Sequence, residues 1–133
     1  MTDFLWPIRV YYEDTDAAGV VYYANYLKFM ERARTEYIRS LGFEQDDLRE
    51  QQAVIFVVRN VTMQLHRPAQ FNDELEVVSN IHGIARTHLS FKQVIRRGDE
   101  AQLLCEADIQ VVCIDAKIWK PRAIPPEMLL GIK

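Results

Sequence analysis

The densest group of chemically useful side chains lies in the segment 12–26, where two aspartates, a glycine and several tyrosines precede a helical pattern. A carboxylate can act as a nucleophile or a general base toward a carbonyl carbon. The first turn of a helix offers unpaired backbone N–H groups and partial positive charge, which stabilise the oxygen of that carbonyl. Because Asp14 and Asp16 precede such a turn, the segment predicts a site for acyl transfer. An aspartate before a helix is more often only a cap or a turn residue, and that reading stays open.

Strands and one long helix must position this segment. Apolar and polar residues alternate at 8–13, which predicts a strand that leads into it. From about residue 24 to 41 the apolar period is 3.6, and Gly42 follows where a helix closes with positive φ. Asp46 or Asp47 can cap a short helical turn after the long helix. Four further strands are predicted at 53–66, 74–84, 86–96 and 102–114.

The order of these elements predicts an α+β fold. Short connections between the last four strands favour antiparallel pairing, which sets one helix against one sheet. The helix carries apolar area around much of its circumference, at Tyr26, Phe29 and Tyr37, so we expect a curved five-stranded antiparallel sheet that wraps it. The exposed sheet edges predict a homo-oligomer, a dimer or preferably a tetramer, with each active site at a subunit boundary.

The composition excludes several classes of protein. The 133 residues are 49% hydrophobic and 26% charged, with five Gly and five Pro, which describes one domain over residues 1–133 rather than a disordered chain. A formal net charge of -3 argues against nucleic acid as a partner. No apolar stretch is long enough to span a membrane.

The two cysteines predict a cytoplasmic protein with reduced thiols. Cys105 and Cys113 lie in one predicted strand, which would separate their Cα atoms by about 26 Å. A disulfide bridges less than about 7 Å, so both thiols are expected in the core. Residues 1–7 also lack the basic and apolar regions of a signal peptide.

The histidines and the glutamates of the predicted helix are weaker candidates for a functional role. His66, His82 and His88 lack metal-ligand spacing, so no metal site is predicted, and His66 and His88 are expected on strand surfaces. Glu36 has arginines within one helical turn, which is typical of a solvated ion-pair face. Glu31 lies closer to the apolar stripe of the helix and stays a minor alternative for catalysis.

The segment Asp14–Tyr26 resembles the signature of 4-hydroxybenzoyl-CoA-thioesterase-like hotdog proteins. The similarity is greatest to the YbgC branch, the acyl-CoA thioesterases associated with the Tol–Pal system. It continues at 31–36, 56–59, 111–115 and 120–125. The resemblance implies a hotdog fold and an enzyme that hydrolyses an acyl-CoA to a free acid and CoA.

The resemblance also implies roles for single residues. Asp16 takes the place of the catalytic carboxylate, as nucleophile or general base, and Asp14 is expected only to shape the turn. The oxyanion site is a backbone N–H at the helix start near Tyr23, and Gly19 and Val21 are candidates for substrate binding. Many members of the branch carry His where this chain has Tyr23, so any role of that imidazole does not transfer.

Coenzyme A is part of the implied substrate, and no separate cofactor is expected. Its phosphates require a local basic patch on this net-acidic chain. One candidate patch consists of Arg86, Lys92, Arg96 and Arg97, and another of Arg59, Arg67, Lys120 and Arg122. Arg86 and Thr87 are preferred, because related enzymes meet the nucleotide at the strand that these residues begin.

Two alternatives to a thioesterase stay open. A non-catalytic hotdog module would bind acyl thioesters or an acyl carrier protein in envelope lipid metabolism without turnover, although such a module would be free to lose Asp16. A hotdog dehydratase needs an acid–base pair built around His, and the segment 12–26 contains none. For a thioesterase itself, the acyl carrier is either CoA or an acyl carrier protein.

Overall fold

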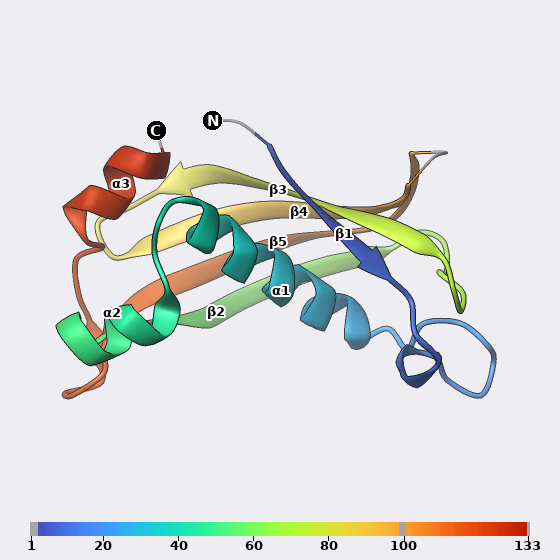
Figure 1. Ribbon diagram of the computed structural model, residues 1–133, viewed down its shortest axis with the longest axis horizontal. Coiled ribbons are helices and arrows are strands. Elements are labelled where there is room, and N and C mark those ends of the chain that lie inside the picture. Colours follow the sequence, from blue (N-terminus) through green and yellow to red (C-terminus); the bar gives the residue numbers. More distant parts are fainter. Residues whose placement is uncertain (1–2, 99–100, 133) are drawn as a thin grey trace.

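The long helix α1 (Asn25–Ser40) forms where the 3.6-residue period predicts it. Its last residue is Ser40 and its C-cap is Leu41, and Gly42 follows with φ of 95°, a conformation that glycine adopts without steric cost. The buried side of the helix packs on the sheet through Tyr26, Phe29, Met30, Ala33, Tyr37 and Ile38. Figure 1, a view of this computed structural model, which describes residues 3–98 and 101–132, shows α1 lying along one face of the sheet.

The sheet is antiparallel throughout and has the order β1-β3-β4-β5-β2, with β6 added beside β5. Its strands are β1 (Phe4–Arg9), β2 (Val54–Leu65), β3 (Glu74–Ile84), β4 (His88–Arg97), β5 (Gln102–Asp115) and β6 (Lys120–Pro121). Side chains of β3 and β4 alternate between buried and half-buried, as the period of two predicts. The α+β architecture of one long helix on one sheet is therefore confirmed, and β6 is a short addition beside the last residues of β5.

The predicted strand at 8–13 is wrong in its bounds. The strand β1 begins and ends four residues earlier, and the chain then makes a 3₁₀ turn, η1 (Tyr12–Asp14). Pro7 is accepted because β1 is an edge strand. The Asp14 carboxylate accepts the backbone N–H of Tyr11 at 2.8 Å, a local bond that competes with sheet pairing.

Two smaller helices complete the fold at the end of the sheet away from η1. The predicted helical turn near Asp46 is the two-turn helix α2 (Gln45–Gln52), whose N-cap is Glu44. The helix α3 (Pro126–Ile132) follows the proline-rich tail and was not predicted from the sequence. Figure 1 shows both at the opposite end of the molecule from the loop that precedes α1. No helix within the described ranges is long and apolar enough to cross a membrane.

A buried polar network joins α1 to the centre of the sheet. Arg34 donates from Nη1 to Oε1 of Gln93 at 2.8 Å, and Gln93 donates from Nε2 to the Met30 carbonyl and to Oγ of Ser79. Gln93 and Ser79 have no exposed surface, and Arg34 keeps only 8%. Burial lowers the pKa of the Arg34 guanidinium, while the charge of Glu31 one turn earlier opposes that change. The core therefore contains the guanidinium of Arg34, which is almost fully shielded from solvent and is held in place by the side-chain amide of Gln93.

The two cysteines are core residues, as predicted. Cys105 and Cys113 are both fully buried and unbonded to each other in β5. Burial raises the pKa of the Cys105 thiol to about 12, and it also raises the pKa of Cys113. Both groups are therefore protonated near neutral pH and contribute packing rather than nucleophilic reactivity.

Candidate active site

The loop between η1 and α1 is held in a tight turn around Asp16. Gly19 donates its N–H to the Asp16 carbonyl at 3.0 Å, and the Asp16 N–H donates to the Val20 carbonyl at 2.9 Å. Gly19 has φ of 84°, so the turn requires a residue without a Cβ. Oδ1 of Asp16 accepts the N–H of Ala18 at 2.9 Å, whereas within the described ranges no protein donor reaches Oδ2. One oxygen of this exposed carboxylate thus fixes the turn and the other is available to a ligand.

Asp14 has a different environment. Its side chain is buried, and its carboxylate closes η1 through the N–H of Tyr11. Its backbone carbonyl accepts the Tyr22 N–H at 3.0 Å and the Asn25 side-chain amide at 2.9 Å. Asp14 therefore ties the loop to the start of α1, which agrees with the structural role expected for it.

The start of α1 carries unused backbone donors. The N-cap position is Ala24, which makes no side-chain cap, and the first turn has no acidic residue. Within residues 3–98 and 101–132, the N–H groups of Tyr23 and Ala24 find no backbone acceptor. Tyr23 is 55% exposed as a residue, and its ring lies against that of Tyr22, with 5.0 Å between the ring centroids. The positive end of α1 is therefore open to an oxygen ligand.

A groove of about 310 Å³ connects these features. One wall consists of Asp16, Val20, Val21, Tyr23 and Tyr26, and the other of Leu65, His66, Arg67 and Pro68. The walls are joined beside the groove, because Val21 donates its N–H to the Ala69 carbonyl and Ala69 donates its N–H to the Tyr26 hydroxyl. Burial raises the pKa of that phenol, so it stays neutral.

The second wall is set by a bulge where β2 ends. The N–H groups of His66 and Arg67 both donate to the Leu104 carbonyl, at 2.8 and 3.0 Å, which interrupts the regular alternation of side chains. Nε2 of His66 lies 2.8 Å from Oε2 of Glu106. Lys92 donates to the other oxygen of Glu106 at 3.0 Å and, together with His66, lowers the pKa of that carboxyl. Glu106 lies between the buried residues Cys105 and Ala107 of β5, so its side chain and the imidazole beside it lie on the face of the sheet away from α1.

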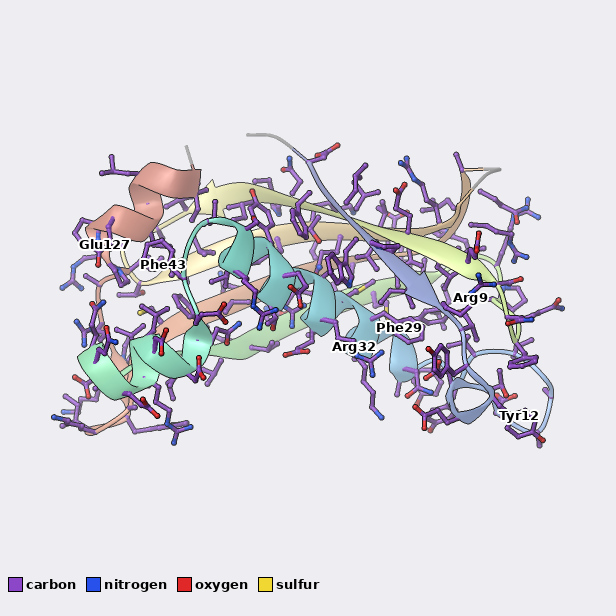
Figure 2. All side chains as sticks on the ribbon, viewed as in Figure 1. Arg9, Tyr12, Phe29, Arg32, Phe43 and Glu127 are labelled. Carbon is purple, nitrogen blue, oxygen red and sulfur yellow. The ribbon has the colours of Figure 1, made fainter. Side chains whose placement is uncertain are left out.

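The predicted place of His66 on a strand surface is confirmed, because its imidazole contacts Glu106 on the outer face of the sheet. No signal within 12–26 could have shown that residues 65–68 line the groove, because the pairing of β2 with β5 brings them there. Tyr12 lies outside the groove, and Figure 2 shows its side chain at the outer tip of this end of the molecule. Tyr12 is 80% exposed, and its ring lies edge-on to that of Phe71.

The structure brings together only some of the predicted binding residues. Val21 lines the groove, and Gly19 shapes its turn without lining it. Arg59 is exposed at the bulge in β2, within neither wall. Arg86 and Thr87 lie in the turn between β3 and β4, at the end of that hairpin away from the groove. The 11 residues of β3 span about 36 Å, so these two residues do not reach Asp16 within one chain.

The two predicted basic patches differ in how many of their cations are available to bind phosphate. Three of the four cations of the first patch are in ion pairs, namely Lys92 with Glu106, Arg96 with Glu76 and Arg97 with Asp73. Of the second patch, Arg67 lines the groove itself. Within the part of the chain that the structure describes, no three His, Cys, Asp or Glu side chains are grouped closely enough to share a metal ion.

Comparison with known proteins shows which proteins this chain resembles. The family model described as "Thioesterase-like superfamily" matches residues 10–132. The acyl-CoA thioester hydrolase YbgC of Escherichia coli is 46% identical over 132 residues, 99% of this chain and 97% of that protein. The acyl-CoA thioesterase YbgC of Haemophilus influenzae is 42% identical over 94% of this chain and 90% of its own length. The structure of a 1,4-dihydroxy-2-naphthoyl-CoA thioesterase from Synechocystis superposes with a TM-score of 0.92 at 24% identity, covering 98% of this chain and 96% of that one.

Proposed function

This chain belongs to the thioesterase-like superfamily, and from that membership we propose how it hydrolyses acyl-CoA thioesters. It is a thioester hydrolase of the YbgC type. The YbgC proteins of Escherichia coli and Haemophilus influenzae are similar to it over almost their whole length. The predicted resemblance and the hotdog fold are confirmed. The proposal concerns which groups do the chemistry and where the substrate lies.

Asp16 is the catalytic carboxylate of this proposal, and the uncapped start of α1 is the oxyanion site. The thioester carbonyl would lie in the groove with its oxygen toward the N–H groups of Tyr23 and Ala24. Asp16 Oδ2 would then attack the carbonyl carbon or deprotonate a water molecule beside it. The observation that carries the proposal is the available oxygen of Asp16 in a groove that also contains unpaired helix-start donors.

A thioester makes modest demands on such a site. Its leaving group is the thiolate of a thiol with a pKa of about 8.5, judged from cysteine. This group departs without prior protonation, in contrast to an amine. One carboxylate and one oxyanion site therefore suffice, and a Ser-His-Asp triad is not required.

The test compares the two aspartates of the loop. Asp16→Asn keeps the size of the side chain and removes its charge, so turnover of acyl-CoA should fall by about 10²-fold or more. The folded oligomer and CoA binding should be largely retained. The matched control is Asp14→Asn, which should mainly reduce stability because it weakens the closure of η1. Thiol release measured over a panel of aliphatic and aryl acyl-CoAs gives both values.

Two outcomes would contradict the assignment. Normal turnover by the Asp16 variant together with an inactive Asp14 variant would transfer the catalytic role to Asp14. An absence of thiol release from every CoA and carrier-protein thioester in wild type would favour the non-catalytic binding module instead. The same panel reports the preferred acyl group and whether the carrier is CoA or an acyl carrier protein.

We further propose a dimer or tetramer with each site at a subunit boundary. The 12-residue strand β2 is an edge of the sheet and leaves a row of backbone groups without a partner strand. Arg86 and Thr87 lie too far from Asp16 within one chain, so they would contact CoA only from a neighbouring subunit. Sedimentation should give an oligomer, and a stable, active monomer at micromolar concentration would contradict this. Because both cysteines are free, we infer that the enzyme works in the cytoplasm. We expect no separate cofactor, because CoA is part of the proposed substrate.

A further inference from the structure

The second wall of the groove belongs mainly to the connection between β2 and β3. This connection, residues 66–73, lies wholly within the described part of the chain and contains no helix or strand. Its first three residues, His66, Arg67 and Pro68, line the groove. A segment without a helix or strand does not fix its own backbone, so groups from other elements must do so. The Leu104 carbonyl holds the first two residues, and two side chains from α1 and β4 hold the rest.

The support from the helix is the hydroxyl of Tyr26. Tyr26 lies in the first turn of α1, lines the groove and is almost fully buried. Its oxygen accepts the N–H of Ala69 at 3.0 Å, and the carbonyl of Ala69 accepts the N–H of Val21 at 2.8 Å. Ala69 is therefore bonded both to the start of α1 and to the loop that carries Asp16. Because Ala69 has no exposed surface, water cannot replace the hydroxyl as its acceptor.

The support from the sheet is the guanidinium of Arg97, the last residue of β4. Its Nη2 donates to the Pro68 carbonyl at 3.0 Å, and its Nη1 lies 3.2 Å from Oδ2 of Asp73. The same carboxylate oxygen accepts the N–H of Gln70 at 2.8 Å, so one cation holds both ends of the segment 68–73. Nε of Arg97 is buried and has no hydrogen-bond partner within the described ranges. The fold bears the cost of this unpaired donor at the place where the other two nitrogens bind the segment.

The supported segment is in turn bonded to the loop that carries Asp16. Val20 lies opposite Gln70 in an isolated antiparallel bridge, and the Val20 carbonyl accepts the N–H of Asp16 at 2.9 Å. We propose that Tyr26 and Arg97 are positioning residues, which from opposite sides fix the second wall of the groove relative to Asp16. The inference rests on the proposed function, because these residues have this role only if Asp16 reacts in the groove. Neither side chain contacts the reacting atoms.

A wall that can shift should affect the rate of the reaction more than the affinity for substrate. The thioester would lie between the two walls, with its carbonyl carbon toward Asp16 and its oxygen toward the start of α1. In such a geometry a displacement of about 1 Å can lower the rate by up to about 10²-fold. Binding of the remote parts of CoA does not depend on that alignment, so KM should change little. A contact that served only stability would instead lower the melting temperature and leave kcat per folded molecule unchanged.

Substitutions at the two supports test the proposal by steady-state kinetics. Tyr26→Phe removes one oxygen and leaves the buried N–H of Ala69 without its acceptor. We expect kcat to fall by about tenfold and KM to change by less than about threefold. Arg97→Leu should give a loss of similar size, and Arg97→Lys a smaller one, because an ammonium group replaces only part of the contacts of the guanidinium. Hydrogen exchange of the Ala69 amide, measured by NMR, should be faster in Tyr26→Phe than in wild type.

A double variant and two matched controls distinguish positioning from unrelated effects. Because both side chains act on the same segment, Tyr26→Phe combined with Arg97→Leu should lose less than the product of the two single losses in kcat. The control for the tyrosine is Tyr37→Phe, a buried residue of the same helix whose hydroxyl has no hydrogen bond within the described ranges. The control for the arginine is Arg39→Leu, since Arg39 also bridges two acceptors, at the other end of α1. Both controls should keep the kcat of wild type.

Three results would overturn the inference. These are an unchanged kcat in either Tyr26→Phe or Arg97→Leu, an equal loss in the matched control, and losses that multiply in the double variant. Active variants at both supports together with an inactive Asp16→Asn would reject the positioning roles and leave the proposed thioesterase function intact. Full activity of Asp16→Asn would reject the proposed function itself. If Tyr26→Phe does not fold, as judged by circular dichroism, the kcat of Arg97→Leu decides, and a wild-type value there rejects the proposal.

Discussion

The middle of α1 and its start contact polar groups in opposite ways. Beneath its middle, Arg34, Gln93 and Ser79 are buried and satisfy one another through hydrogen bonds. Before its first residue, Asp16 and the N–H groups of the helix start are exposed and retain hydrogen-bonding capacity. The buried polar network thus stabilises the packing of helix on sheet, whereas the groove keeps its polar groups for a ligand.

This difference shows how a polar residue can be assigned to structure or to chemistry. Asp14 and Asp16 are two residues apart and identical in type, and each carboxylate accepts one backbone N–H, yet the first is buried and the second is exposed beside the groove. Their burial distinguishes them. The residue type alone does not, since a carboxylate serves equally as a cap or as a nucleophile.

The largest effect on stability is expected in the buried network. Gln93→Leu removes the acceptor of Arg34 and leaves a buried cation without its hydrogen bond, which should lower the free energy of unfolding by about 3–5 kcal/mol. Turnover per folded molecule should stay within a small factor, because the groove is not touched. Urea denaturation measures the loss, with exposed Gln51→Leu in α2 as the control. A loss as small as in the control would mean that the network is not structural.

A smaller loss is expected for the double variant Cys105→Ala and Cys113→Ala. Each substitution leaves a small cavity, and the two should together cost about 2 kcal/mol, while turnover stays unchanged. In wild type, burial raises the pKa of the Cys105 thiol to about 12 and also raises the pKa of the Cys113 thiol, so both are protonated at neutral pH. A thiol reagent should therefore label them only after the protein unfolds. Loss of turnover in a well-folded double variant would instead reveal a catalytic thiol.

The smallest effect is expected at the Tyr23 ring. If the oxyanion site uses the backbone N–H of this residue, Tyr23→Phe should change kcat by less than about threefold, because the exposed hydroxyl does no chemistry. Steady-state kinetics on the preferred acyl-CoA test this. A loss comparable to that of Asp16→Asn would assign the catalytic contribution to the phenol, and the contrast between backbone and side-chain donors at this end would disappear.

Local patterns in the sequence predict α1, Gly42 at its end and four of the strands, because period and turn chemistry are properties of neighbouring residues. The bounds of β1 were missed, since the Asp14 carboxylate replaces a sheet hydrogen bond with a local one. The second wall of the groove could not be assigned from local patterns. The backbone N–H groups of His66 and Arg67 are held by the Leu104 carbonyl, and only the strand order brings these residues together.

That strand order also sets when the groove can form during folding. The strand β2 lies beside β5, so its pairing must close a loop that contains β3 and β4. Contacts of such large sequence separation form slowly, whereas the β3–β4 hairpin and α1 depend on near neighbours. Because the Leu104 carbonyl fixes His66 and Arg67, the second wall of the groove cannot exist before β5 is in place. A refolding chain therefore acquires its helix early and its catalytic competence among the last events.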